Sequence, residues 1–144
     1  MARHPGLSLI QDFDPHTYLR LLVAQALVDG MTAEERDYIL LRGALLDVDA
    51  TELLERPLQT LPPVDPGLSE TTRRVILRDC IVLACIDGDF SEAERERVHR
   101  LAEWLSVPVE SVDRIEDWLH RYWDLMEEAE ALLAGFEAPR TASP

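Results

Sequence analysis

Residues 79–95 constrain the fold more than any other part of the chain. They contain seven consecutive apolar residues, 80–86, with a carboxylate on either side of the run. A helix that is apolar on every side belongs in a protein core, and this run is too short to cross a membrane. Gly88 can end such a helix, and Ser91 with Glu94 predicts a capping box that begins the next one. The stretch therefore predicts a buried helix, a tight acidic turn and a second helix.

An earlier copy of this pattern lies at residues 26–36. Asp29-Gly30 matches the later Asp87-Gly88, and Thr32 with Glu35 repeats the capping box. Further along, residues 45–48 correspond to residues 104–107. Internal repeats at this spacing indicate stacked helical units.

In these positions the chain resembles the tellurite-resistance TerB-like family, over roughly residues 15–120. The family pattern is a helix ending in Ala-x-x-Asp-Gly, a Ser/Thr-x-x-Glu helix start, and a repeat of the pair. Asp29-Gly30, Glu35, Asp87-Gly88 and Glu94 carry the resemblance. It implies an all-helical, non-enzymatic module linked to stress response and tellurite resistance, whose acidic turn residues hold a divalent metal.

The fold expected from these patterns is all-α, with two pseudo-repeated helix pairs, short third helices and a long C-terminal helix. We expect a flexible arm at 1–13, a single helical domain at 14–136 and a disordered tail at 137–144. Asp14 followed by Pro15 predicts the first helix start. Ser69 predicts the start of the central helix, which we expect to run to Asp87.

Further elements follow from proline positions and hydrophobic spacing. Residues 51–58 predict a short helix cut by Pro57, and the proline-rich stretch 61–67 predicts a linker. The last helix is expected to begin near Glu110 and to end at Gly135. The apolar stripe that predicts it consists of Val112, Ile115, Leu119, Tyr122, Met126, Ala129 and Leu133.

The charge balance excludes several classes of partner. The chain carries 28 acidic and 14 basic residues, a net charge of −14, and contains no lysine. Such a surface repels phosphate backbones and anionic lipids, so we expect nucleic acid and membrane surfaces to be poor partners. No apolar run is long enough to span a bilayer, so we expect no membrane insertion. Cys80 and Cys85 do not have the spacing of a disulfide framework or a zinc site. With no signal peptide before residue 15, we expect reduced thiols and a cytoplasmic location.

The second acidic turn is the candidate metal site. Asp87, Asp89 and Glu94 offer hard oxygen ligands suited to calcium or magnesium, with Asp79 two helical turns earlier. Asp29 and Glu35 are the corresponding candidates in the first turn. The alternative is that the aspartates accept local backbone N–H groups and the glutamates serve only the capping boxes. An EF-hand does not fit. Counting from Asp87, glycine falls at the second position of the loop and not the sixth, and the twelfth position is Val98 instead of glutamate.

Two non-catalytic functions remain. The first is a TerB-like module that binds a divalent cation through an acidic turn, and the second is a metal-free adaptor that docks a partner through its aromatic C-terminal helix. No catalytic motif is present and the four histidines are scattered, so an enzyme, including a metal-dependent one, is the least supported class. The aromatic residues near the C-terminus, Trp104, Trp118, Tyr122 and Trp123, suit either core packing or docking of another protein. The helix expected over 33–48 is apolar on two sides; either the C-terminal helix covers it or it is a partner surface.

Overall fold

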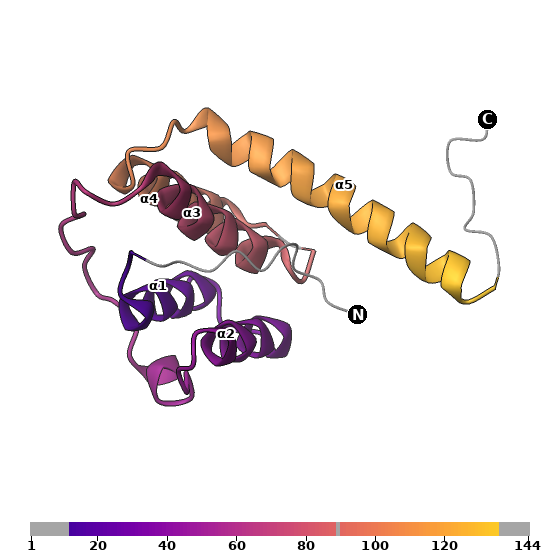
Figure 1. Cartoon of the computed structure of the whole chain (residues 1–144), viewed down its shortest axis with the longest axis horizontal. Helices are drawn as coiled ribbons and strands as arrows, with labels where there is room; N and C mark the ends of the chain where they lie inside the picture. The colour runs from indigo at the N-terminus through magenta and orange to yellow at the C-terminus, as the bar shows by residue number, and fades with distance from the viewer. Residues whose placement is uncertain (1–11, 89, 136–144) are drawn as a thin grey trace.

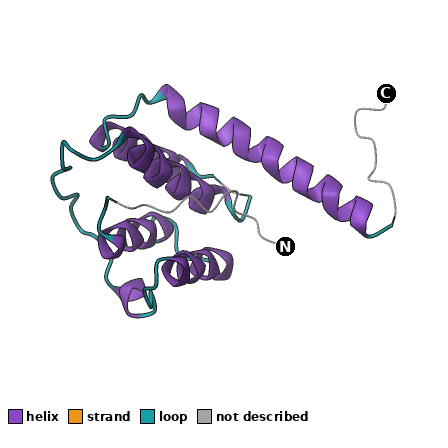
Figure 2. Ribbon diagram, in the orientation of Figure 1, coloured by secondary structure: helices purple, strands orange, loops and turns teal. Residues whose placement is uncertain are grey.

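The computed structural model describes residues 12–88 and 90–135, and throughout these residues the structure is helix, turn and loop without strands (Figure 2). The all-α prediction is therefore confirmed. In chain order the elements are α1 (Pro15–Ala26), α2 (Ala33–Leu45), the short 3-10 helix η1 (Glu52–Glu55), α3 (Glu70–Cys85), α4 (Glu92–Trp104) and α5 (Glu110–Leu133). None of the described helices is long and apolar enough to span a membrane.

The helix starts are those that the sequence predicts. The side chains of Asp14 and Ser69 accept hydrogen bonds from backbone N–H groups in the first turns of α1 and α3. A complete capping box, with both reciprocal bonds, begins α2 at Thr32 and α4 at Ser91. Each bond satisfies a backbone donor that the helix itself leaves without a partner.

The two acidic turns have the same backbone geometry. Gly30 and Gly88 both have φ of 87°, a conformation that favours glycine. α1 and α3 end slightly before these glycines, with C-caps at Leu27 and Ile86. The central helix thus ends at Cys85 and not at Asp87, because the chain already turns at residues 86–88.

Helix α3 is the centre of the fold. It packs against α1, α2, α4 and α5, and its apolar run is buried on all sides. Leu83 is completely buried, as expected from its place in the middle of the run. Cys80 and Cys85 are buried free cysteines. Burial raises the pKa of the Cys85 thiol to about 12.

One predicted element is absent from the described residues. The sequence predicts a short third helix in each copy, but only the first copy has one, η1. In the second copy, the corresponding residues form the first turns of α5. Pro57 stops the chain after η1, whereas no proline follows Pro108 until Pro139, so the second segment continues as one long helix.

The position of α5 corrects a second expectation. It packs on α3 and α4, while α2 packs on α1 and α3. The C-terminal helix therefore does not cover the outer stripe of α2, where Leu41 is exposed. Figure 1 shows α5 running along the α3–α4 side of the molecule and then beyond the ends of the other helices.

The attachment of the chain before α1 is firmer than a flexible arm over 1–13 would suggest. The Asp12 carboxylate accepts bonds from the Ser69 backbone and the Thr72 hydroxyl at the start of α3. Phe13 packs against the core. Residues 1–11 and the predicted tail at 137–144 lie outside the described residues.

Candidate functional site

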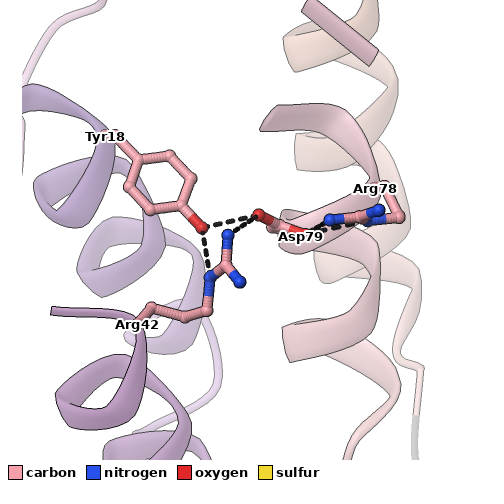
Figure 3. A network of polar contacts seen from close by, with 4 residues as sticks. All are labelled: Tyr18, Arg42, Arg78 and Asp79. Atoms are coloured by element: carbon pink, nitrogen blue, oxygen red, sulfur yellow. Dashed lines mark hydrogen bonds and ion pairs between the residues drawn. The ribbon is translucent and has the colours of Figure 1, made fainter. Parts of the chain in front are cut away.

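A buried polar network joins three helices at the centre of the molecule (Figure 3). The Tyr18 hydroxyl of α1 donates to Oδ2 of Asp79 at 2.6 Å, and Arg42 of α2 donates to the same oxygen at 3.0 Å. Arg42 Nε also donates to the Tyr18 hydroxyl at 2.9 Å. On the other side, Arg78 donates to Oδ1 of Asp79 at 3.0 Å. One carboxylate thus holds α1, α2 and α3 together.

Both charges at the centre of this network are almost fully removed from water. Arg42 and Asp79 are each 1% exposed. Burial raises the pKa of Tyr18, and the Asp79 carboxylate raises it further, so the hydroxyl stays protonated and can donate. Burial opposes the charge on Arg42, but Asp79 and the two tyrosines beside it outweigh burial and raise its pKa. Such a pair is stable only when hydrogen bonds satisfy both groups, as they do here.

Of these four residues, only Asp79 was expected from the sequence to belong to a site, and as a metal ligand. A cation at Asp79 would have to displace three protein donors from its two oxygens. The signal that could have revealed the network is Arg42, which follows Tyr38 by one helical turn on the buried side of α2. A charge on a buried face requires a partner of opposite charge, and Asp79 lies next to the most apolar run in the chain.

The capping-box glutamates bring the two acidic turns into electrostatic contact. Glu35 and Glu94 are buried, and each accepts a bond from its own N-cap backbone through Oε1. Burial raises the pKa of both glutamates. The carboxylates of Asp87 and Glu94 also raise the pKa of Glu35, and those of Asp29 and Asp87 also raise that of Glu94.

Four of the predicted metal ligands, Asp29, Glu35, Asp87 and Glu94, thus lie within electrostatic range of one another, but they do not form a ready cage. Among the described residues no group of three or more Asp, Glu, His or Cys side chains is arranged to hold a metal ion. Asp89 lies outside the described residues. The donor set of Asp29, Glu35, Asp87 and Glu94 has the oxygen chemistry of a calcium site, and a cation there would relieve their mutual repulsion.

We predict that Glu35→Gln raises stability at neutral pH by on the order of 0.5 kcal/mol, the size of a like-charge pair. Glutamine keeps the capping bond and removes a buried charge. Because the folded state raises the pKa of Glu35, its stabilising contribution is present below the unfolded-state pKa and is lost as pH rises through the folded-state pKa. Thermal melts across pH should therefore show that acidification raises the stability of the variant less than that of the wild type. A variant less stable than the wild type at neutral pH would contradict this account.

The second half of α5 is the other candidate site. Trp123 packs against the core, and among the described residues no side chain of α5 beyond it does so. The exposed fractions of Leu125, Leu132 and Leu133 are 63%, 64% and 84%. Trp118 is also exposed, whereas Trp104 packs against the core, so core packing accounts for only part of the aromatic cluster.

No protein-family model matches this chain, and neither a curated protein nor a solved structure does. The resemblance to the TerB-like family therefore depends on the residues of the two acidic turns alone.

Proposed function

We propose that this chain is a non-catalytic, TerB-like helical module of a stress or tellurite-resistance system, and that it docks a protein through the second half of α5. The observation that carries the proposal is the apolar stripe of α5, which continues beyond the body of the molecule. This docking surface consists of Leu125, Met126, Ala129, Leu132 and Leu133.

The stripe follows a spacing of three and four residues along the whole helix. Its first members, Val112 and Leu119, are completely buried in the body. Its last member, Leu133, is mostly exposed, and Leu125 and Leu132, seven residues apart, extend the exposed apolar surface along one edge of the stripe. Such a stripe is the pattern with which one helix packs against another. A partner helix or groove can therefore continue, on the docking surface, the packing that α3 and α4 give to the first half.

The charges around the docking surface define the chemistry of the partner. Residues 124–133 contain four acidic side chains, Asp124, Glu127, Glu128 and Glu130, and no basic one. A second copy would bring two such ends together in chains that each carry a net charge of −14, so self-association is opposed by repulsion. The partner that fits is a different protein with an apolar groove edged by basic residues.

Two features support the TerB-like part of the proposal. The turns share the same glycine geometry and the same capping boxes. A second pair of equivalent positions is Asp47 and Ser106, which have φ of 59° and 57° directly after α2 and α4. Matching irregularities of this kind are expected when two helix pairs arise from one repeated unit.

The docking proposal is tested by placing a photo-cross-linking amino acid at Leu132 and, as the matched control, at Glu127. Glu127 lies on the opposite side of α5 and is also exposed. We expect one defined protein to be cross-linked from position 132 in the native host and not from position 127.

Binding to that purified partner should then depend on the docking surface. Leu132→Glu should weaken it by about 2 kcal/mol or more, roughly thirtyfold, as expected for an apolar anchor. Glu127→Gln should leave it nearly unchanged. Equal cross-linking from both positions, or equal affinities of the two variants, would contradict the proposal, as would a cross-link between two copies of this chain.

We propose a divalent cation at the acidic turns as a second candidate function. The observation that favours it is the electrostatic contact among Asp29, Glu35, Asp87 and Glu94 described above. Calcium is the more suitable ion, because flexible oxygen ligands without fixed octahedral geometry suit it better than magnesium.

If the cation binds, millimolar calcium should raise the melting temperature. A ligand at a hundred times its dissociation constant adds about 2.7 kcal/mol, which is easily measured in a domain of this size. Asp87→Asn should abolish the gain. A melting curve unmoved by calcium or magnesium, with a mild effect of Asp87→Asn, would show that the turns serve only to end and begin helices.

A further inference from the structure

A small cavity lies between α1, α3, α4 and the segment that follows η1. Its volume is about 130 Å³, and its walls come from Leu21, Gln25, residues 58–61, Cys80, Arg97, Arg100 and Leu101. An engineered protein cavity of about 150 Å³ accommodates one benzene molecule. The size therefore suits a ligand of roughly six non-hydrogen atoms.

One wall of the cavity carries a buried donor that has no partner. Gln25 is 2% exposed, and its side-chain Nε2 makes no hydrogen bond within residues 12–88 and 90–135. Leaving an amide donor buried and unsatisfied costs about 1–3 kcal/mol, so such a group calls for a bound acceptor. An acceptor inside the cavity would satisfy it.

The charged groups of the cavity are cationic, and Gln59 and Thr60 add neutral polar groups to its lining. Arg97 and Arg100 line it from α4, and none of its described lining residues is acidic, although the chain has twice as many acidic as basic residues. No ion pair of either arginine occurs within the described part of the chain. Arg97 lines the same cavity as the buried Cys80 thiol. The donors of this cavity thus favour an anion.

Apart from Gln59 and Thr60, the remaining walls are apolar. Leu21, Leu58 and Leu101 line the cavity, together with Cys80. Burial raises the pKa of Cys80 far above its ordinary value, so the thiol stays neutral and acts as an apolar wall instead of a nucleophile. A ligand that fills the cavity therefore needs an apolar part beside its anionic group.

We propose that this cavity is a binding site for a small monocarboxylate with a compact apolar tail. The carboxylate accepts hydrogen bonds from Gln25 Nε2 and from the Arg97 guanidinium, and Arg100 adds attraction at the exposed side. The tail packs against Leu21, Leu58 and Leu101. This site is separate from the docking surface of α5 and from the acidic turns.

The test is a titration of the full chain with sodium butyrate, followed by nuclear magnetic resonance of the Gln25 side-chain amide. We expect saturable shifts of this amide and of the Cys80 and Leu101 backbone signals. Two further probes separate the contributions: 1-butanol has the same tail without charge, and inorganic phosphate has charge without a tail. Both should bind at least about tenfold more weakly than butyrate, because each lacks half of the contacts.

Variants connect the binding to the named residues. Arg97→Gln should weaken butyrate binding by at least about tenfold through loss of a charge-assisted bond. Arg97 is only partly buried, so this variant should fold. Gln25→Met is the second variant, which removes the amide donor and retains the side-chain shape. Arg114→Gln, at an exposed arginine of α5 outside the cavity, should leave the affinity unchanged. Absence of saturable shifts, or equal affinity for butanol or for phosphate, would overturn the proposal.

Discussion

Asp79→Asn is expected to lower the free energy of unfolding by about 3–5 kcal/mol, the cost of breaking a buried ion pair from one side. The substitution leaves the Arg42 guanidinium, which is 1% exposed, without its countercharge. Tyr18 also loses a charged acceptor for its hydroxyl. Because these partners come from α1 and α2, the loss should loosen the packing of both helices on α3. Chemical denaturation followed by circular dichroism measures the effect.

A control and a double variant separate the buried pair from ordinary charge effects. Asp113→Asn removes an acid that meets Arg95 at 3.5 Å on the exposed surface, and should cost less than about 1 kcal/mol. Arg42→Met combined with Asp79→Leu removes both buried charges and should be much more stable than Asp79→Asn alone. A loss for Asp79→Asn as small as that of the control would show that the network does not hold the three helices together.

Leu83→Ala is the second variant with a large expected effect, about 2–5 kcal/mol. Leu83 is completely buried in the helix that contacts every other long helix of the fold. Removing its side chain loses apolar contacts and leaves a cavity that the surrounding helices can close only in part. Leu133→Ala on α5 is the matched control, since 84% of its surface is already exposed and little should change. A loss below about 0.5 kcal/mol for Leu83→Ala would contradict the central position of α3.

The parts of the fold that could be predicted from the sequence depend on local interactions. Four helix caps could be predicted because the bonds that form them span only three residues; they are Asp14, Thr32, Ser69 and Ser91. The apolar run of α3 predicts burial without any knowledge of its neighbours. The start of α5 near Glu110 is also a local feature of the sequence and could be predicted. The place of α5 in the fold could not.

The parts that were missed depend on contacts between distant segments. Arg42 and Asp79 are 37 residues apart, and Tyr18 and Asp79 are 61 apart. Nothing in the spacing of either helix indicates which charge pairs with which. The position of α5 on α3 and α4, which leaves Leu41 of α2 exposed, is likewise a result of tertiary packing.

The same distinction between local interactions and contacts of distant segments applies to the candidate sites. The sequence identified Glu35 and Glu94 through their capping boxes, but their proximity across the two turns appears only in the folded chain. The exposed end of α5 could not be distinguished from a core helix, because its stripe has the same spacing in the buried and exposed halves. The cavity beside Gln25 combines four segments and has no counterpart in the local pattern.

The proposed docking role requires that the second half of α5 be unsupported in the isolated chain, and amide hydrogen exchange measures this most directly. We expect residues 124–133 to exchange rapidly, because a helical segment of about ten residues is only marginally stable without packing. Residues 112–119, which include the buried Val112 and Leu119, should exchange slowly. Addition of the partner cross-linked from position 132 should slow exchange over 124–133. Equally slow exchange in both halves of the isolated monomer would show that the surface is already covered, and would contradict the account.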